Sequence, residues 1–404
     1  MKALYVNLSN SRMLAAKVAS RFSRRALFGP QAPLQFEERP PPPLPGPRYV
    51  RVRNRLAGIC GSDVHFVQAD GDPRIAIAAV PGARRMYLGH EVAGEVTEVG
   101  DDVQSLKVGD RVTVNRWPGS CLGEGKDDLC QHCADGNYSR CCNAMLQDPR
   151  GIGGGLSEEQ VVHERRLLPL PDDVTDEQAV LLEPAACGLR AALRRPPAPG
   201  DKVLVIGCGT MGLMTVQALR AVQPDCEITA LAQFDYQASM ARRLGAKNTI
   251  MLGDDAYSEV ARLSGGTVCR GSFGNKVVLG GLDAVYDCVG NARTLSDALR
   301  WSRPGGTVVL LGVHLAPMRL DLTPVWYWEV DLLGTYAHGA EDWQGERVPT
   351  FELVIRLLRE RKLDFEGFIT HRFPLSEYRE AFLAAMDQKR TRAIKVIFDY
   401  KGGS

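Results

Sequence analysis

The 404-residue sequence has no long hydrophobic run and no excess of charge of either sign. No apolar stretch approaches the roughly 18 residues that a bilayer-spanning helix needs, and the opening MKALYV alternates as a strand does, unlike a signal peptide. Lys and Arg total 49 and Asp and Glu total 48, which leaves no overall field for nucleic acid or an anionic membrane. We therefore expect a cytoplasmic protein that binds a small neutral molecule and neither nucleic acid nor membrane.

A chain of this length exceeds what one hydrophobic core usually supports, which predicts two domains and a cleft between them. The segment YVRVRNRLAG alternates apolar and basic residues and predicts a half-buried antiparallel strand. From KVLVIG to about residue 337, apolar runs alternate with helical stretches, as in a doubly wound parallel sheet. The fold class is therefore α/β. We expect a mainly β catalytic domain over residues 1–184, a Rossmann nucleotide-binding domain over 185–337, and a C-terminal return to the first domain over 338–404.

We interpret two segments as insertions into this domain arrangement. Residues 9–29 are rich in arginine and have a helical pattern, and residues 264–281 are rich in glycine. The sequence assigns no function to either.

A glycine-rich turn follows the apolar run KVLVI and opens a helix. This context predicts binding of a dinucleotide, because glycine lets a pyrophosphate approach the backbone amides at a helix N-terminus. A tight turn that uses glycine only for its backbone freedom is the alternative. The expected cofactor-binding residues of this turn are Gly207, Gly209, Thr210, Met211 and Gly212.

The acidic residue that usually binds the ribose about 20 residues further on is missing. Ala232 and Gln233 stand at the end of the next predicted strand, and Glu227 stands at its beginning, at the wrong edge of the sheet. Loss of the carboxylate removes its repulsion of a 2′-phosphate, although no arginine follows directly to bind one. The choice between NAD and NADP therefore remains open.

Cysteine, histidine and glutamate residues ahead of the nucleotide domain form a candidate metal site. Catalytic zinc takes three protein ligands from Cys, His and Asp or Glu, so Cys60, His90 and Glu183 suffice, with Glu91 as a fourth or alternating ligand. The alternatives are that Cys60 is only a small buried residue and that Glu183, before Pro184, caps the following helix.

Six segments follow one another in this order: GICGSDVH, GHEVAGEVTEVG, VGDRV, LLEP, VLVIGCGTMG and ITHRFPL. Together they resemble the zinc-dependent medium-chain alcohol and polyol dehydrogenases, and EVDLLG and ITHRFPL are most similar to the sorbitol and threonine dehydrogenase branch. The likeness covers most of the chain outside the two insertions, and it implies a GroES-like catalytic domain.

The resemblance also implies roles for individual residues. It makes Cys60, His90 and Glu183 the zinc ligands, with Glu91 as ligand or near neighbour. Asp63 matches an outer partner of the zinc-bound histidine, and such a partner fixes the imidazole tautomer. Ser62 and His65 match a proton relay, although from the residues alone Ser62 could cap a helix and His65 could be an ordinary exposed side chain.

A second group of cysteines matches the last three ligands of the structural zinc lobe that many of these enzymes carry, over about residues 115–145. The family spacing puts the first ligand at Asp127, whereas the nearest upstream thiol is Cys121, which we prefer. Tetrahedral zinc accepts either set, and Cys142 is left over. A loop of reduced cysteines without metal is the alternative. The three matched ligands are Cys130, Cys133 and Cys141.

These features predict a zinc-dependent oxidoreductase that transfers a hydride between a substrate carbinol and NAD or NADP. We expect an alcohol or carbonyl substrate and a homodimer or homotetramer. A non-catalytic nucleotide-binding protein and a zinc-free quinone reductase are disfavoured, because the catalytic ligand set is complete. A zinc-ribbon nucleic-acid binder would need a basic face that the balanced charge does not indicate.

Overall fold

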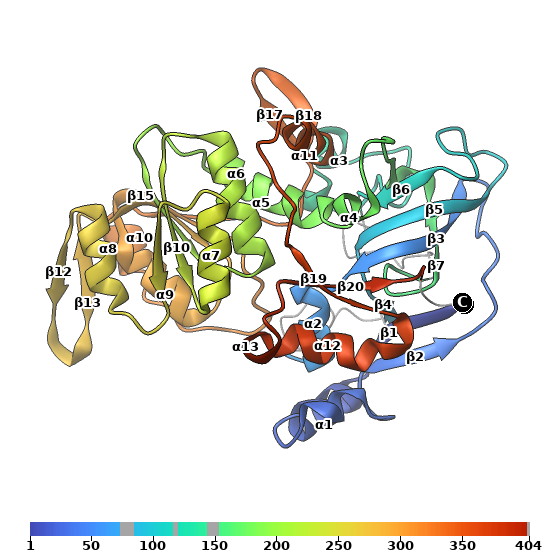
Figure 1. Ribbon diagram of the computed structural model, residues 1–404, viewed down its shortest axis with the longest axis horizontal. Coiled ribbons are helices and arrows are strands. Elements are labelled where there is room, and N and C mark those ends of the chain that lie inside the picture. The colour runs from blue at the N-terminus through green and yellow to red at the C-terminus, as the bar shows by residue number, and fades with distance from the viewer. Residues whose placement is uncertain (73–84, 116–119, 144–152, 402–404) are drawn as a thin grey trace. The chain divides into compact units, whose positions relative to one another are not determined.

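The computed structural model describes residues 1–72, 85–115, 120–143 and 153–401, and the chain divides into two compact units (Figure 1). Unit 1 comprises Met1–Glu183 and Phe365–Ser404, and unit 2 comprises Pro184–Asp364. None of the helices in these described ranges is long and apolar enough to cross a membrane.

Unit 1 is built on a seven-stranded sheet. In β3, Val50 and Val52 are fully buried, whereas Arg51 pairs with Glu98 on the other face, so the predicted half-buried antiparallel strand is confirmed. The strand order is β19 (Ile369–Phe373), β20 (Lys395–Asp399), β3 (Tyr49–Gly58), β5 (Glu91–Val99), β6 (Arg111–Val114) and β8 (Leu167–Pro169), with β7 (Glu159–His163) also paired to β3.

A smaller antiparallel sheet and several short helices complete unit 1. The sheet order is β2 (Leu34–Glu38), β1 (Lys2–Asn7) and β4 (Arg85–Tyr87). The helices are α1 (Asn10–Ala19), η1 (Arg24–Phe28), α2 (Gly61–Gln68), α3 (Gln131–Ala134), η3 (Tyr138–Arg140), η4 (Glu164–Arg166), α4 (Asp176–Ala179), η6 (Leu375–Glu377), α12 (Tyr378–Met386) and α13 (Gln388–Thr391).

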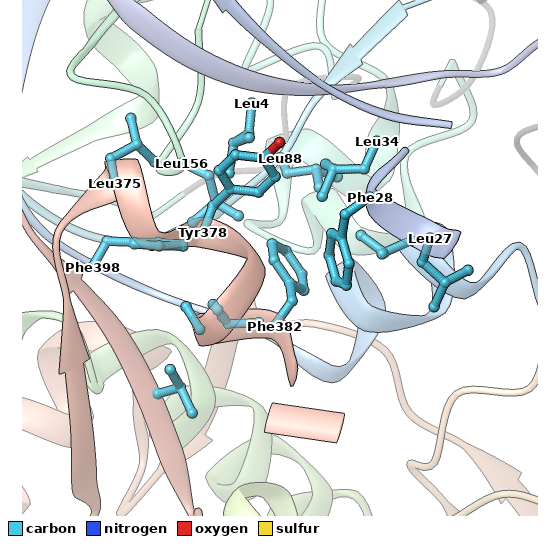
Figure 2. Close-up of a cluster of buried hydrophobic side chains, with 14 of the residues drawn as sticks. Leu4, Leu27, Phe28, Leu34, Leu88, Leu156, Leu375, Tyr378, Phe382 and Phe398 are labelled. Carbon is cyan, nitrogen blue, oxygen red and sulfur yellow. The ribbon is translucent and has the colours of Figure 1, made fainter. Parts of the chain in front are cut away.

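The core of this region joins the two ends of the chain. Phe382 of α12 is fully buried, and its ring centroid lies 6.4 Å from that of Phe28 in η1 (Figure 2). Leu4 of β1 and Phe398 of β20 belong to the same cluster. The N-terminal segment and the C-terminal return are therefore held together by apolar burial.

Unit 2 contains a six-stranded parallel sheet, which confirms the predicted doubly wound fold. β9 reads KVLVI, a continuous apolar run, because both faces of a central parallel strand are buried. The strand order is β11 (Asn248–Met251), β10 (Glu227–Ala232), β9 (Lys202–Ile206), β14 (Leu282–Asp287), β15 (Ser302–Leu310) and β16 (Asp331–Gly334), and the helices between them are α6 (Thr210–Val222), α7 (Asp235–Arg243), α8 (Ala256–Ser264), α9 (Ala292–Trp301) and α10 (Thr323–Tyr327).

Unit 2 extends further along the chain than the sequence-based boundary at residue 338. The hairpin of β17 (Ala340–Trp343) and β18 (Glu346–Pro349) and the helix α11 (Thr350–Arg359) belong to it. Glu341 is one link between the hairpin and the rest of the unit, since its carboxylate pairs with Arg190 of α5 (Leu182–Arg194) at 2.7 Å. The glycine-rich insertion forms a separate hairpin of β12 (Thr267–Arg270) and β13 (Lys276–Leu279), next to η5 (Ser272–Gly274).

Replacing Phe382 by Ala tests the importance of the core in unit 1. A buried Phe→Ala change costs about 3–5 kcal/mol, because the lost ring leaves a cavity. Hydrogen exchange of β20 amides, followed by mass spectrometry, measures this loss as a lower free energy of opening. Phe22→Ala is the matched control, because Phe22 is 89% exposed, and we expect a change within about 0.5 kcal/mol. Equal effects of the two variants would contradict the assignment of the core.

Candidate functional site

The pairing of β3 with β5 brings the first candidate ligands together. Gly58 at the end of β3 lies opposite Glu91 at the start of β5, so Cys60 and His90 lie just beyond the same end of the strand pair. One ligand atom each from Cys60, His90 and Glu91 lies within 4.8 Å of the others. A thiolate, an imidazole and a carboxylate at this separation form a donor set that fits zinc.

Two glycines make this close approach possible. A Cβ added to Gly58 would lie 1.9 Å from Oε2 of Glu91, so any larger residue would displace that carboxylate. Gly89 has a φ of +89°, and a Cβ there would lie 2.5 Å from the backbone nitrogen of Leu156. The glycine of GHE is therefore required both by its left-handed backbone and by a close backbone contact.

Asp63 supports the site through the backbone. Its Oδ2 accepts a hydrogen bond from the backbone N–H of Cys60 at 2.9 Å, and its Oδ1 accepts one from Gly89 at 3.3 Å. Burial raises the pKa of Asp63, although the nearby His90 and these N–H groups oppose the rise. The carboxylate thus ties together the two loops that carry Cys60 and His90, in addition to attracting the His90 imidazole.

Sequence reasoning missed Lys395, which is buried beside the candidate ligands. Its Nζ lies 2.7 and 2.6 Å from the two carboxylate oxygens of Glu91 and donates to the carbonyl of Ile59 at 3.1 Å. Burial lowers the pKa of Lys395, but the Glu91 carboxylate, together with the charges of Cys60 and Glu183, more than compensates and the net shift is upward. The signal in the sequence was a lysine directly before the apolar run VIF of IKVIFDY.

Glu183 lies in the first turn of α5, one residue after the helix begins at Leu182. It is buried, with 9% of its surface exposed. Burial by itself would lower the pKa of the His90 imidazole, but the charges of Cys60 and Glu183 raise it well above its ordinary value. The Glu183 carboxylate is therefore close enough to act on His90, although it is not among the three donors that lie within 4.8 Å of one another.

The two residues of the expected relay lie on α2. Ser62 is in its first turn and is partly exposed. His65 is 36% exposed, and its Nδ1 lies 3.0 Å from a carboxylate oxygen of Asp70. The structure thus gives His65 a carboxylate hydrogen-bonding partner. The contacts of the described residues do not join Ser62 directly to His65.

The second candidate metal centre contains all four preferred cysteines. Their sulfur atoms lie within 4.8 Å of one another, with 3.5 Å between Cys121 and Cys141 and 3.8 Å between Cys130 and Cys141. Four thiolates on a tetrahedral zinc, each about 2.3 Å from the metal, lie about 3.8 Å apart, so the cluster fits this ion. The fourth member is Cys133. Residues 116–119 and 144–145 of the expected lobe lie outside the described residues.

The surroundings of the cysteines distinguish the two candidates for the first ligand. Cys121 is fully buried in the cluster, whereas the Asp127 side chain is 88% exposed and pairs with Arg165. Cys142 is exposed. Burial opposes ionisation of Cys130, but backbone hydrogen bonds from Cys133 and Cys142 lower its pKa to about 6. A thiolate at neutral pH suits a metal ligand.

The glycine turn of unit 2 has the geometry that a pyrophosphate needs. Gly207 follows β9 with a φ of +88°, and a Cβ at Gly212 would lie 1.7 Å from the carbonyl oxygen of Gly207. Gly209 is the N-cap of α6, and a Cβ there would meet nothing within 4 Å. The N-terminus of α6, which begins with Thr210 and Met211, is therefore open for a phosphate group to reach its amides.

The position expected to read the ribose carries no charge. Ala232 ends β10 and is fully buried, and the next residue, Gln233, is exposed. Glu227 lies at the opposite end of β10 and pairs with Lys247 at 2.5 Å. This position agrees with the prediction that Glu227 lies at the wrong edge of the sheet to bind the ribose.

Comparisons with known proteins agree with this arrangement. Residues 46–172 match the family model of the alcohol dehydrogenase GroES-like domain, and residues 210–351 match that of the zinc-binding dehydrogenases. The chain is similar to L-idonate 5-dehydrogenase of Vitis vinifera, with 34% identity over 88% of this chain and 89% of that protein. It is 32% identical to sorbitol dehydrogenase of Arabidopsis thaliana over 88% and 90% of the two chains.

A solved structure shows the same relationship. The crystal structure of 2R,3R-butanediol dehydrogenase from Bacillus subtilis superposes with a TM-score of 0.70 and 25% identity, covering 91% of this chain and 96% of that one. The two domain models, the sequence identities and this superposition together establish the relationship. The chain belongs to the zinc-dependent medium-chain polyol dehydrogenase family, and it is an NAD(P)-linked alcohol or polyol oxidoreductase.

Proposed function

We propose that the chain oxidises a secondary hydroxyl of a polyol-like substrate to a ketone, and that Cys60, His90 and Glu183 hold the catalytic zinc. The cluster of a thiolate, an imidazole and carboxylates at the end of β3 and β5 carries this proposal. Idonate, sorbitol and butanediol, named for three similar proteins, all have a secondary hydroxyl beside another hydroxyl. We infer the same substrate class here.

The reaction requires a hydride and a proton to leave the substrate. Zinc supplies Lewis acidity that favours ionisation of the hydroxyl, and the nicotinamide supplies the acceptor for the hydride. Ser62 would take the hydroxyl proton, and His65, which contacts the Asp70 carboxylate, would be its later acceptor. A carrier would have to lie between them, because the contacts of the described residues do not join the two side chains. The products are a ketone, a reduced cofactor and a proton.

Glu91 has a positioning role in this proposal. Both of its oxygens bind the ammonium group of Lys395, which neutralises the carboxylate inside the protein. Cys60 and Glu183 then supply the negative charge of the ligand set. A carboxylate ligand tempers the acidity that the metal gives to a bound group, compared with a neutral imidazole.

We further propose that the active protein is a cytoplasmic homodimer or homotetramer. All 11 cysteines are free, which suits a reducing compartment. Unit 2 exposes Trp326 and Tyr327 of α10 by 70% and 67%, and α10 directly precedes the edge strand β16 in the chain. Exposed aromatic residues beside an open sheet edge favour pairing with a second copy.

A cofactor-coupled activity screen tests the proposed function. Polyols, amino alcohols and simple alcohols would each be offered with NAD and with NADP, and reduction of the nicotinamide would be followed by its absorbance. We expect the highest kcat/KM with a polyol, and none with Cys60→Ser. Activity that is unchanged in this variant would contradict the site.

Glu183→Gln tests the third ligand. The variant keeps the size of the side chain, so we expect at most about 1 kcal/mol of lost stability. A lost ligand should lower zinc affinity or the rate of hydride transfer about tenfold or more. Zinc content and pre-steady-state hydride transfer, measured on the same sample, check this. Glu177→Gln is the control, because Glu177 is an exposed glutamate in the neighbouring α4, and wild-type behaviour of both variants would refute the assignment.

Cys130→Ser tests the structural cluster. Removing one thiolate of a closed zinc site weakens metal binding, and metal binding is coupled to folding, so stability should fall more than turnover. Cys142→Ser should leave both unchanged, because Cys142 is exposed and outside the cluster. Elemental analysis of dialysed wild-type protein should find about two zinc ions per chain, from the two separate ligand sets. A larger effect of Cys130→Ser on turnover than on thermal stability would contradict the structural role.

Ala232→Asp tests the choice of cofactor. The uncharged position predicts measurable use of NADP by the wild type. A carboxylate at the end of β10 would repel a 2′-phosphate and shift the ratio of kcat/KM values towards NAD by about tenfold or more. Gln233→Asp places the same charge on the exposed neighbour and serves as the comparison. Identical ratios in wild type and Ala232→Asp would show that this position does not read the ribose.

A further inference from the structure

The insertion over residues 9–29 folds into α1 and η1, but α1 presents its apolar side chains in an unusual way. Its inward face is small, and the buried residue of the helix is Ala16. Its large apolar residues face solvent instead, with Leu14 exposed by 66%, Val18 by 52% and Phe22, just after the helix, by 89%. Exposure of these three side chains costs free energy in water, so a partner that covers them would be favoured.

These three residues form one stripe. Leu14 and Val18 are spaced by four positions, which places their side chains along the same side of α1. Phe22 follows four positions later, in the turn after the helix, where its backbone N–H bonds the carbonyl of Ala19. The stripe is defined as Leu14, Val18 and Phe22.

The insertion that carries the stripe is basic and has no acidic residue of its own. The insertion contains five basic residues and no Asp or Glu. Within the described part of the chain, Lys17, Arg21 and Arg25 are exposed and form no ion pair. Arg12 and Arg24 donate to backbone carbonyls, which leaves their charges uncompensated as well.

The fold holds this surface in place at the margin of unit 1. Leu27 and Phe28 of η1 are buried in the core cluster, so the segment is anchored on one side. Figure 1 shows α1 at the outer edge of the unit, beyond α12. The stripe and its cations are therefore presented outward by a packed segment.

We propose that α1 docks the protein on an anionic lipid surface. In this orientation Leu14, Val18 and Phe22 enter the boundary between headgroups and acyl chains, and Lys17 and Arg21 bind lipid phosphates or carboxylates beside them. A fluid lipid surface needs no complementary groove, which suits a short convex helix. The expectation of no membrane partner rests on the net charge of the whole chain, in which 49 basic residues nearly balance 48 acidic ones. This net charge does not reflect the local excess of positive charge in the insertion.

The exposed apolar residues and the excess of cations disfavour other binding partners for this surface. A second copy would bring five cations against five cations, and like charges repel. Nucleic acid would pair with the cations but would leave the aliphatic side chains of Leu14 and Val18 without a partner. An acidic protein would use the cations as well, and the test therefore includes an acidic polypeptide.

Sedimentation of the full-length protein with vesicles tests the proposal. One set of vesicles is pure phosphatidylcholine, and the other is equal parts phosphatidylcholine and phosphatidylserine. We expect binding to the anionic set only, weakening as salt is raised. Lys17→Gln with Arg21→Gln should lower the affinity about 25-fold, at about fivefold for each cation. Leu14→Ser with Phe22→Ser should lower it about tenfold or more, because apolar area is no longer buried.

Phe273→Ser is the matched control, because Phe273 is a fully exposed aromatic residue in the hairpin insertion of unit 2. It should bind vesicles as the wild type does, and circular dichroism should show that every variant is folded. Three results would overturn the proposal: no binding to either vesicle, equal binding to both, or no effect of Leu14→Ser with Phe22→Ser. Tighter binding to polyglutamate than to the anionic vesicles would overturn it too, and would assign the surface to an acidic protein.

Discussion

The buried pair of Glu91 and Lys395 is the interaction on which the catalytic unit depends. Both side chains are almost fully buried, and burying two charges costs several kcal/mol per ion unless they satisfy each other closely. Here both carboxylate oxygens bind the ammonium group, whose remaining contact is the carbonyl of Ile59. The pair joins the start of β5 to the start of β20. Because β20 follows unit 2 in the chain, the C-terminal segment must return before the site is complete.

The same pair lies among the candidate zinc ligands, whose charges act on one another. Burial lowers the pKa of His90, but the charges of Cys60, Glu183 and Asp63 more than compensate and the net shift is upward. Gly58 allows this arrangement, since any side chain there would meet the Glu91 carboxylate. Packing, backbone conformation and electrostatics therefore act on the same few atoms, and a change in one of them alters the others.

The candidate nucleotide site of unit 2 is built from residues that are close together in the sequence. The glycine turn that we propose for phosphate binding consists of the end of β9, three glycines and the amides at the start of α6, all within one short stretch of chain. We propose that the cofactor preference of this site is set at Ala232, at the end of the next strand. A short sequence is enough to build this site because backbone groups supply most of the binding.

Features that arise from neighbouring residues were predictable before the fold was known. The alternation of YVRVRNRLAG, the apolar run of KVLVI before its glycine turn, and the spacing of Cys130, Cys133 and Cys141 all predicted what the structure contains. Tertiary structure alone decided that Cys121 rather than Asp127 joins the cysteine cluster, that Lys395 binds Glu91, and that α1 turns its large apolar residues outward. Periodicity and motif spacing report which face of an element is apolar, but contacts between distant segments depend on how the whole chain packs.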